Sequence, residues 1–60
     1  MLIKFKTDIV EIETEKDNYI CTRPLNDYEY YVYNSNFKFL GQVRYLPNLQ
    51  SFIIKYEGGL

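Results

Sequence analysis

Apolar and polar residues alternate with a period of two along most of this chain. Residues 2–6 read LIKFK and residues 9–15 read IVEIETE, so lysines or glutamates occupy every second position. Successive side chains of a β-strand point to opposite faces of the sheet, and this period therefore gives each strand one apolar face. The alternation predicts an all-β fold without a helix.

Five strand regions are predicted from this pattern and from the turn residues between them. They span residues 2–15, 19–23, 28–33, 37–46 and 51–57. The apolar phase changes across Thr7 and Asp8, so we expect a bulge or bend inside the first region. We predict a single domain over residues 1–60. It is a small antiparallel sheet, bent into a partly open barrel or completed by a homodimer.

The short chain needs support that neither a disulfide nor a metal can provide. A domain of 60 residues buries only about 60% of the surface that its unfolded form exposes. Cys21 is the only cysteine, so no disulfide forms within the chain. The chain has no histidine, and zinc sites recruit several Cys or His ligands, so we expect no metal. We expect no cofactor either, and we expect aromatic packing or self-association to stabilise the fold.

The charge balance argues against general binding to nucleic acid or to anionic membranes. The formal net charge is -1, whereas such domains are clearly basic. The N-terminal segment MLIKFKTDIVEIE contains charges throughout and lacks the uninterrupted apolar run of a signal peptide or membrane span. We therefore expect a cytoplasmic protein without membrane contact. A lone free cysteine fits a reducing compartment.

The pairing register decides which residues share a face. A four-residue hairpin loop over residues 46–49 would place Val43 opposite Phe52. An even-numbered loop before it would place Tyr30 opposite Gly41, where an aromatic ring covers the glycine backbone. These registers predict one apolar core face, which comprises Ile3, Phe5, Val10, Ile12, Ile20, Tyr28, Tyr30, Val32, Phe39, Val43, Tyr45, Phe52, Ile54 and Tyr56.

The opposite face carries the candidate binding residues. It combines two tyrosines, two aliphatic residues and three cations: Tyr31, Tyr33, Lys38, Leu40, Arg44, Ile53 and Lys55. Tyr and Arg are enriched at interface hot spots, and aromatic rings among cations also suit single-stranded nucleic acid. A third interpretation is that the barrel or a second copy covers this face.

The loop before the fourth strand leaves the assignment of two tyrosines open. A three-residue loop at residues 34–36 would reverse the faces. Tyr31 and Tyr33 would then join Phe37 and Phe39 in the core.

An acidic segment forms a second candidate contact. Residues 8–17, DIVEIETEKD, contain five acids and one lysine. Along a strand, Glu11, Glu13 and Glu15 project from one face, with neighbouring positions roughly 6.6 Å apart. This row either engages a basic partner or forms a solvated outer face whose charge protects an edge strand from aggregation.

The sequence offers little material for catalysis. It has no histidine, and Cys21 has no base close in sequence. Ser35 and Ser51 lie in or beside predicted turns, without a nucleophile motif. We expect no catalytic residue and no enzyme. Cys21, in a predicted strand, is interpreted as a small packed hydrophobic residue.

Residues 31–59, YVYNSNFKFLGQVRYLPNLQSFIIKYEGG, resemble the repeating unit of certain small uncharacterised proteins encoded by bacteriophages and prophages. The resemblance lies in VYN, in FLGQVRYLP and in the aromatic and aliphatic segment that ends near a glycine. It implies a phage or mobile-element accessory protein. Such proteins often bind a host protein and disable or redirect it.

These observations predict a small non-enzymatic protein-interaction module that binds an unknown protein partner. The first alternative is a single-stranded nucleic-acid-binding β protein that uses the same face with Lys38 and Lys55. The second alternative is a structural homo-oligomer.

Overall fold

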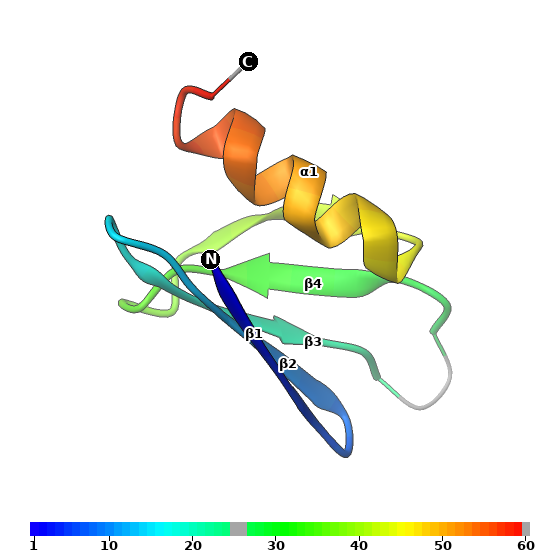
Figure 1. Cartoon of the computed structure of the whole chain (residues 1–60). Coiled ribbons are helices and arrows are strands. Elements are labelled where there is room, and N and C mark those ends of the chain that lie inside the picture. The colour runs from blue at the N-terminus through cyan, green and yellow to red at the C-terminus, as the bar shows by residue number, and fades with distance from the viewer. Residues whose placement is uncertain (25–26, 60) are drawn as a thin grey trace.

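The computed structural model describes residues 1–24 and 27–59. It shows an antiparallel sheet followed by one helix (Figure 1). The elements are β1 (Leu2–Lys6), β2 (Ile9–Glu13), β3 (Asn18–Thr22), β4 (Tyr30–Tyr33), β5 (Phe39–Val43) and α1 (Leu46–Tyr56). The strands lie in chain order in one five-stranded sheet. The predicted antiparallel sheet is confirmed; it is open rather than closed, with β1 and β5 at its edges.

The first predicted strand region is in fact a hairpin. The chain reverses at Thr7 and Asp8, and Lys6 pairs directly with Ile9. Phe5 then lies opposite Val10, so an odd-numbered and an even-numbered residue share one face. The change of apolar phase that suggested a bulge therefore reflects a two-residue turn between two strands.

The predicted hairpin loop at 46–49 and the predicted strand at 51–57 are wrong, because residues 46–56 form α1. Leu49, Phe52, Ile53 and Tyr56 have the helical spacing i, i+3, i+4, i+7. Leu49 and Ile53 are buried against the sheet, and Pro47 lies in the first turn, where its missing N–H is not needed.

The end of α1 is defined by two glycines. Gly58 has a φ of 84°, which a residue without a side chain adopts readily. Its N–H donates to the Lys55 carbonyl at 3.0 Å, and the Gly59 N–H donates to the Ile54 carbonyl at 2.8 Å. This pair of bonds is a Schellman motif, which satisfies the last carbonyls of the helix.

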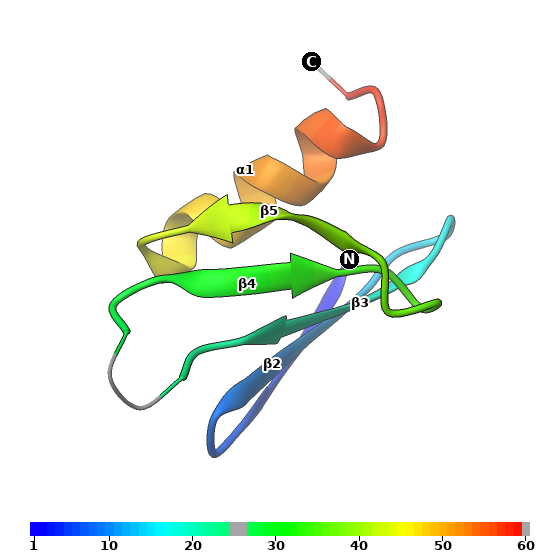
Figure 2. The same cartoon turned by 180° about the vertical axis from the view of Figure 1, so that it is seen from behind.

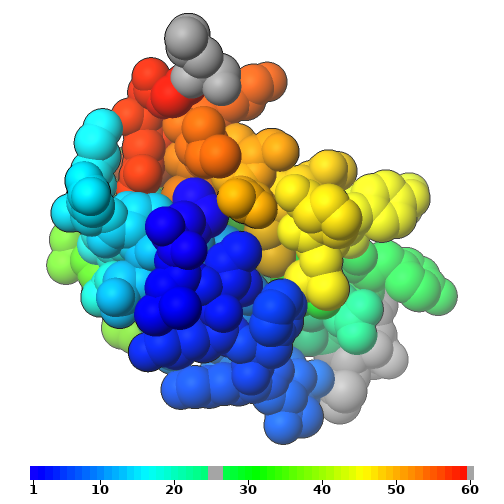
Figure 3. Space-filling model, in the orientation of Figure 1, coloured from blue at the N-terminus to red at the C-terminus, as the bar shows by residue number. Residues whose placement is uncertain are grey.

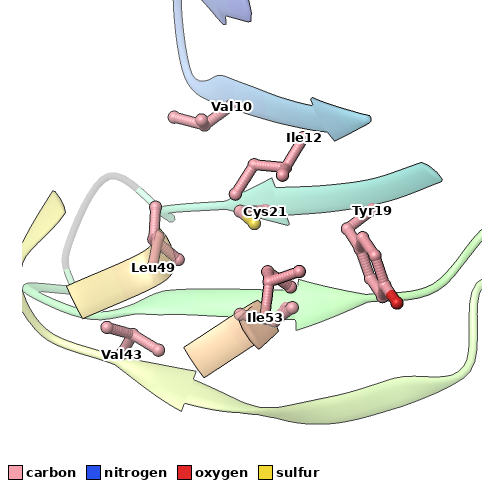
Figure 4. Packing of buried hydrophobic residues seen from close by; sticks show 8 residues of the cluster. Val10, Ile12, Tyr19, Cys21, Val43, Leu49 and Ile53 are labelled. Carbon is pink, nitrogen blue, oxygen red and sulfur yellow. The ribbon is translucent and has the colours of Figure 1, made fainter. Parts of the chain in front are cut away.

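The core lies between α1 and one face of the sheet (Figure 4). Its fully buried members are Val10, Ile12, Tyr19, Cys21, Val32, Val43, Leu49 and Ile53. Figure 4 shows strand side chains directed toward Leu49 and Ile53 of the helix. The predicted core positions Val10, Ile12, Val32 and Val43 are confirmed, and Cys21 is a packed hydrophobic residue as interpreted.

Other predicted core residues lie at the surface. They are Phe5, Tyr28, Phe39, Tyr45, Ile54 and Tyr56. Tyr28 precedes β4, which begins at Tyr30, and Tyr45 lies between β5 and α1. Ile54 and Tyr56 belong to α1 itself, and Phe5 lies on the edge strand β1, on the helix side but 67% exposed.

The pairing of β4 with β5 differs from the predicted register by two residues. Tyr30 lies opposite Val43, and Val32 lies opposite Gly41. The Phe52 ring of α1 covers Gly41 in place of a cross-strand tyrosine, since a Cβ atom there would meet that ring at 2.9 Å.

Within the described ranges, no helix is long and apolar enough to cross a membrane.

Candidate interaction surface

No element among residues 1–24 and 27–59 covers the face of the sheet that points away from α1, and we call it the open face (Figure 2). The register places side chains on it in rows that cross the sheet. One row runs Lys4, Glu11, Ile20, Tyr33 and Phe39, and the next runs Lys6, Ile9, Thr22, Tyr31 and Gln42. The open face therefore has a charged half on β1 and β2 and an aromatic half on β4 and β5.

Three aromatic rings form the aromatic cluster, defined as Tyr31, Tyr33 and Phe39. The Phe39 ring centroid is 6.1 Å from that of Tyr31 and 5.7 Å from that of Tyr33, both at edge-to-face angles. Tyr31 and Tyr33 are half-buried, and Phe39 is 51% exposed. Edge-to-face pairs stabilise such clusters beyond the area they bury, so the rings are held in place without a partner.

A β-bulge brings Phe39 into this cluster. The register shifts between Val32 and Tyr33, so that Tyr33 faces Phe39. Without the shift, Tyr33 would face Leu40. Leu40 instead packs against the core on the helix side, and its predicted place on the binding face is wrong.

The Tyr31 ring is fixed at its hydroxyl end as well. This hydroxyl donates a hydrogen bond to Oδ2 of Asp27, while Oδ1 of Asp27 accepts the Glu29 N–H at 3.1 Å. The bond from Tyr31 lowers the pKa of Asp27 and raises the pKa of Tyr31. Glu29 in turn accepts a 3.4 Å hydrogen bond from the side chain of Gln42. Carboxylates therefore border the aromatic cluster on this side.

The charged half carries both signs. The Lys6 ammonium and Oε2 of Glu11 form an ion pair at 3.3 Å. Lys4 lies directly across from Glu11, and Glu13 lies across from Leu2. Of the predicted row of acids, only Glu11 and Glu13 lie on the strand. Glu15 lies beyond it, because β2 ends at Glu13.

The seven predicted binding residues do not share one face. Tyr31 and Tyr33 lie on the open face, but Ile53 is fully buried on α1 and Lys55 is exposed in its last turn. Ile53 and Lys55 are separated from the two tyrosines because a helix replaces the predicted fifth strand. Lys38 lies in the loop before β5, and Arg44 lies just after that strand.

Two members of the open face differ from the leading prediction, which places Ile20 and Phe39 in the core. Ile20 lies on the open face between Glu11 and Tyr33. Phe39 shares a face with Tyr31 and Tyr33, as the alternative three-residue loop predicts, but through a bulge and on the open face rather than in the core. For Ile20 a signal existed, because Tyr19 and Cys21 on either side are the buried residues of β3.

The loop between β4 and β5, residues 34–38, contains one aromatic residue, Phe37. It is 71% exposed, and its φ of 61° lies in the left-handed region. Its N–H donates to the Asn34 carbonyl at 2.9 Å, which closes the turn. Left-handed backbone costs a residue with a side chain about 1–2 kcal/mol, and an exposed ring returns little of that through packing.

The part of the chain that the structure describes contains no candidate metal centre. No three His, Cys, Asp or Glu side chains among these residues are grouped to hold a metal ion. Burial raises the pKa of the Cys21 thiol to about 11, so that it is neutral at physiological pH.

Comparison with known proteins gives no family assignment. No family model, curated protein or solved structure matches the chain.

Proposed function

We propose that this protein is a non-enzymatic protein-interaction module that binds a protein partner through its open face. The aromatic cluster carries this proposal. Tyr31, Tyr33 and Phe39 are oriented by ring–ring contacts and by Asp27, on a sheet face that no element of the described chain covers. Preorganised aromatic groups dominate the binding energy of many interfaces.

The charges of the open face support a protein rather than a nucleic acid as the ligand. Its charged half has two lysines, Lys4 and Lys6, and two glutamates, Glu11 and Glu13. Lys6 already forms an ion pair with Glu11. Nucleic-acid surfaces are predominantly basic. A partner with an apolar group for the aromatic cluster and a cation for Glu13 is complementary to this face.

The size of the molecule is compatible with such a complex. A typical specific interface buries about 800 Å² on each partner. The accessible surface of this chain is 4530 Å², so that area is less than a fifth of the total.

Phe37 adds a second observation. An exposed phenylalanine in left-handed backbone destabilises the free protein, and such strain often marks a functional position. Phe37 lies two residues before Phe39, at which β5 begins. We include it among the partner contacts.

The resemblance of residues 31–59 to phage proteins supports a host protein as the partner and a cytoplasmic setting. In this proposal the partner is a chain of different sequence. A second copy of this chain, bound through the same face, is the competing outcome.

The proposal is tested by capture followed by direct binding. The tagged chain is used to capture proteins from a lysate of the organism that encodes it, with nuclease present. A captured protein is then purified, and its affinity is measured for the wild type and for Tyr33→Ser and Phe37→Asn. Both variants are expected to weaken binding at least about tenfold. Phe5→Ser is the matched control, because Phe5 is an exposed aromatic residue of the helix side.

Three results would contradict the proposal. Equal affinity of wild type and Tyr33→Ser would exclude the aromatic cluster as the contact. Binding that requires nucleic acid would support the nucleic-acid alternative. A dimer of the wild type that Tyr33→Ser converts to monomer, measured by analytical ultracentrifugation, would assign the open face to self-association.

A further inference from the structure

A hollow at one end of the molecule is lined by two arginines and two tyrosines. None of these four residues belongs to the rows of the open face. Arg23 follows β3, Tyr28 precedes β4, and Arg44 and Tyr45 connect β5 to α1. In Figure 3 the yellow start of α1 and the green segment before β4 project from the same end. The hollow has a volume of about 410 Å³, within the range of small-ligand sites.

The lining of the hollow is cationic. Arg23 and Arg44 are both exposed, and within residues 1–24 and 27–59 neither guanidinium forms an ion pair. No carboxylate is among the four lining residues. The first turn of α1, which starts beside Tyr45, also contains no acid.

Acids also lie near this end of the molecule, but none is among the four residues that line the hollow. Asp27 accepts hydrogen bonds from Tyr31 and from the Glu29 N–H, and Glu29 accepts one from Gln42. Asp8 shares a neighbouring hollow with Arg23, but no ion pair joins them. Asp27, whose pKa is lowered first by the hydrogen bond from Tyr31, keeps its negative charge nearby. The charged groups among the four lining residues are the two arginines, so the lining itself favours an anion.

Aromatic rings stand beside these cations. Tyr28 is 79% exposed and Tyr45 is 60% exposed. The Arg23 guanidinium carbon lies 5.6 Å from the centroid of the Tyr30 ring, which holds that cation over an aromatic face. The hollow thus presents guanidinium groups, which bind phosphate through paired N–H donors, next to tyrosine rings on which a flat base can stack.

We propose that this hollow binds a phosphate joined to a nucleobase, either as a free nucleotide or as one position of a single-stranded nucleic acid. Arg44 and Arg23 contact the phosphate, and Tyr45 and Tyr28 stack on the base. This site shares Arg44 with the binding face predicted from the sequence, whereas Arg23, Tyr28 and Tyr45 lie outside that predicted set. It is independent of the open face, so that either proposal can fail alone.

The test measures binding of four probes to the full chain. They are a fluorescent oligothymidylate of about twelve nucleotides, uridine monophosphate, uridine and inorganic phosphate. We expect the monophosphate to bind more tightly than uridine or phosphate, because it engages both kinds of group. Tighter binding of the oligonucleotide than of the monophosphate would identify a single strand as the source. The reverse order would identify a free nucleotide.

Matched variants assign the binding to the hollow. Arg44→Gln is expected to weaken oligonucleotide binding about tenfold and to reduce its salt dependence. Lys38→Gln removes the same charge from the β4–β5 loop and is expected to leave affinity unchanged. Tyr45→Ser is expected to weaken binding severalfold. Circular dichroism verifies the fold, and Tyr28→Ser replaces Tyr45→Ser if the latter unfolds.

The proposal is overturned by any of three results. One is the absence of binding to all probes at low salt. Another is an equal loss of affinity in Arg44→Gln and Lys38→Gln, which would indicate only a general charge effect. The last is equal affinity for inorganic phosphate and uridine monophosphate, which would remove the role of the tyrosine rings.

Discussion

The hydroxyl of Tyr19 donates a 2.7 Å hydrogen bond to Oε2 of Glu57 and so joins β3 to the end of α1. The Thr14 hydroxyl donates to the same oxygen at 2.6 Å, and the Lys16 ammonium donates to the Glu57 carbonyl at 2.9 Å. One residue at the end of the helix is thus held by the β2–β3 turn and by a core tyrosine. Because α1 covers only one face of an open sheet, these bonds help to fix where the helix lies.

This contact predicts a loss of stability in acid. Hydrogen bonds, first from Thr14 and then from Tyr19, lower the pKa of Glu57 from its ordinary value of 4.5. A carboxyl whose folded pKa is depressed stabilises the fold above its unfolded pKa, and that stability is lost as the pH falls through the folded value. We expect the melting temperature of the wild type to fall below about pH 4.5 more steeply than that of Glu57→Gln. Glu15→Gln is the control. An equal acid dependence in wild type and Glu57→Gln would contradict the prediction.

The helix predicts a specific pattern of core sensitivity. Leu49 and Ile53 are one helical turn apart and both are buried, whereas Gln50 is exposed. Truncation of a buried leucine or isoleucine to alanine costs about 2–5 kcal/mol, which is comparable to the total stability of a domain this small. We expect Leu49→Ala and Ile53→Ala to be largely unfolded by circular dichroism, and Gln50→Ala to remain folded. A folded Leu49→Ala with an unchanged melting temperature would argue against the helix packing.

The same segment shows why sequence reasoning reached the sheet but missed the helix. Phe52, Ile54 and Tyr56 alternate as in a strand, while Leu49 and Ile53 add a helical spacing to the same stretch. Pro47 and Gly58 could have decided between the two, because they fit the start and the end of a helix. The alternation was a sufficient signal for β1 to β5, although it merged the first two strands.

The candidate surface was only partly predictable for a different reason. The parity of β4 places Tyr31 and Tyr33 on the opposite face from Val32, and the sequence is sufficient for that. The position of Phe39 depends on a bulge, and the loss of Ile53 from the surface depends on the helix. The bulge is a consequence of tertiary packing that local patterns do not encode, whereas the helix had the local signals of Pro47 and Gly58.

Close packing of the helix on the sheet predicts an effect at Gly41. A Cβ atom at this position would lie 2.9 Å from two atoms of the Phe52 ring. Overpacking of this kind costs about 1–3 kcal/mol, so we expect Gly41→Ala to lower the free energy of unfolding. The same substitution should cost less in a Phe52→Leu background, as measured by urea denaturation of all four proteins. Additive effects of the two substitutions would show that the ring and the glycine are not coupled.

Burial of Cys21 predicts a thiol that reports on unfolding. The residue is fully buried, and burial raises its pKa to about 11, so it is both shielded and protonated near neutral pH. We expect alkylation by iodoacetamide to be slow in the native protein and to accelerate across the urea transition. Rapid labelling in the absence of denaturant, at the rate of an unfolded control peptide, would contradict this burial.

The strained loop at Phe37 predicts that two substitutions of this residue differ in stability but not in partner binding. Asparagine adopts left-handed backbone more readily than other residues with a side chain, whereas alanine retains the penalty of its Cβ atom. At a φ of 61° we therefore expect Phe37→Asn to be more stable than Phe37→Ala by roughly 0.5–1 kcal/mol. Both variants remove the exposed ring, so both should weaken partner binding to a similar extent. Thermal denaturation and affinity measurements on the two proteins separate the effects. Equal stability of the two variants would exclude backbone strain at this position, and undiminished binding in both would exclude the Phe37 ring from the interface.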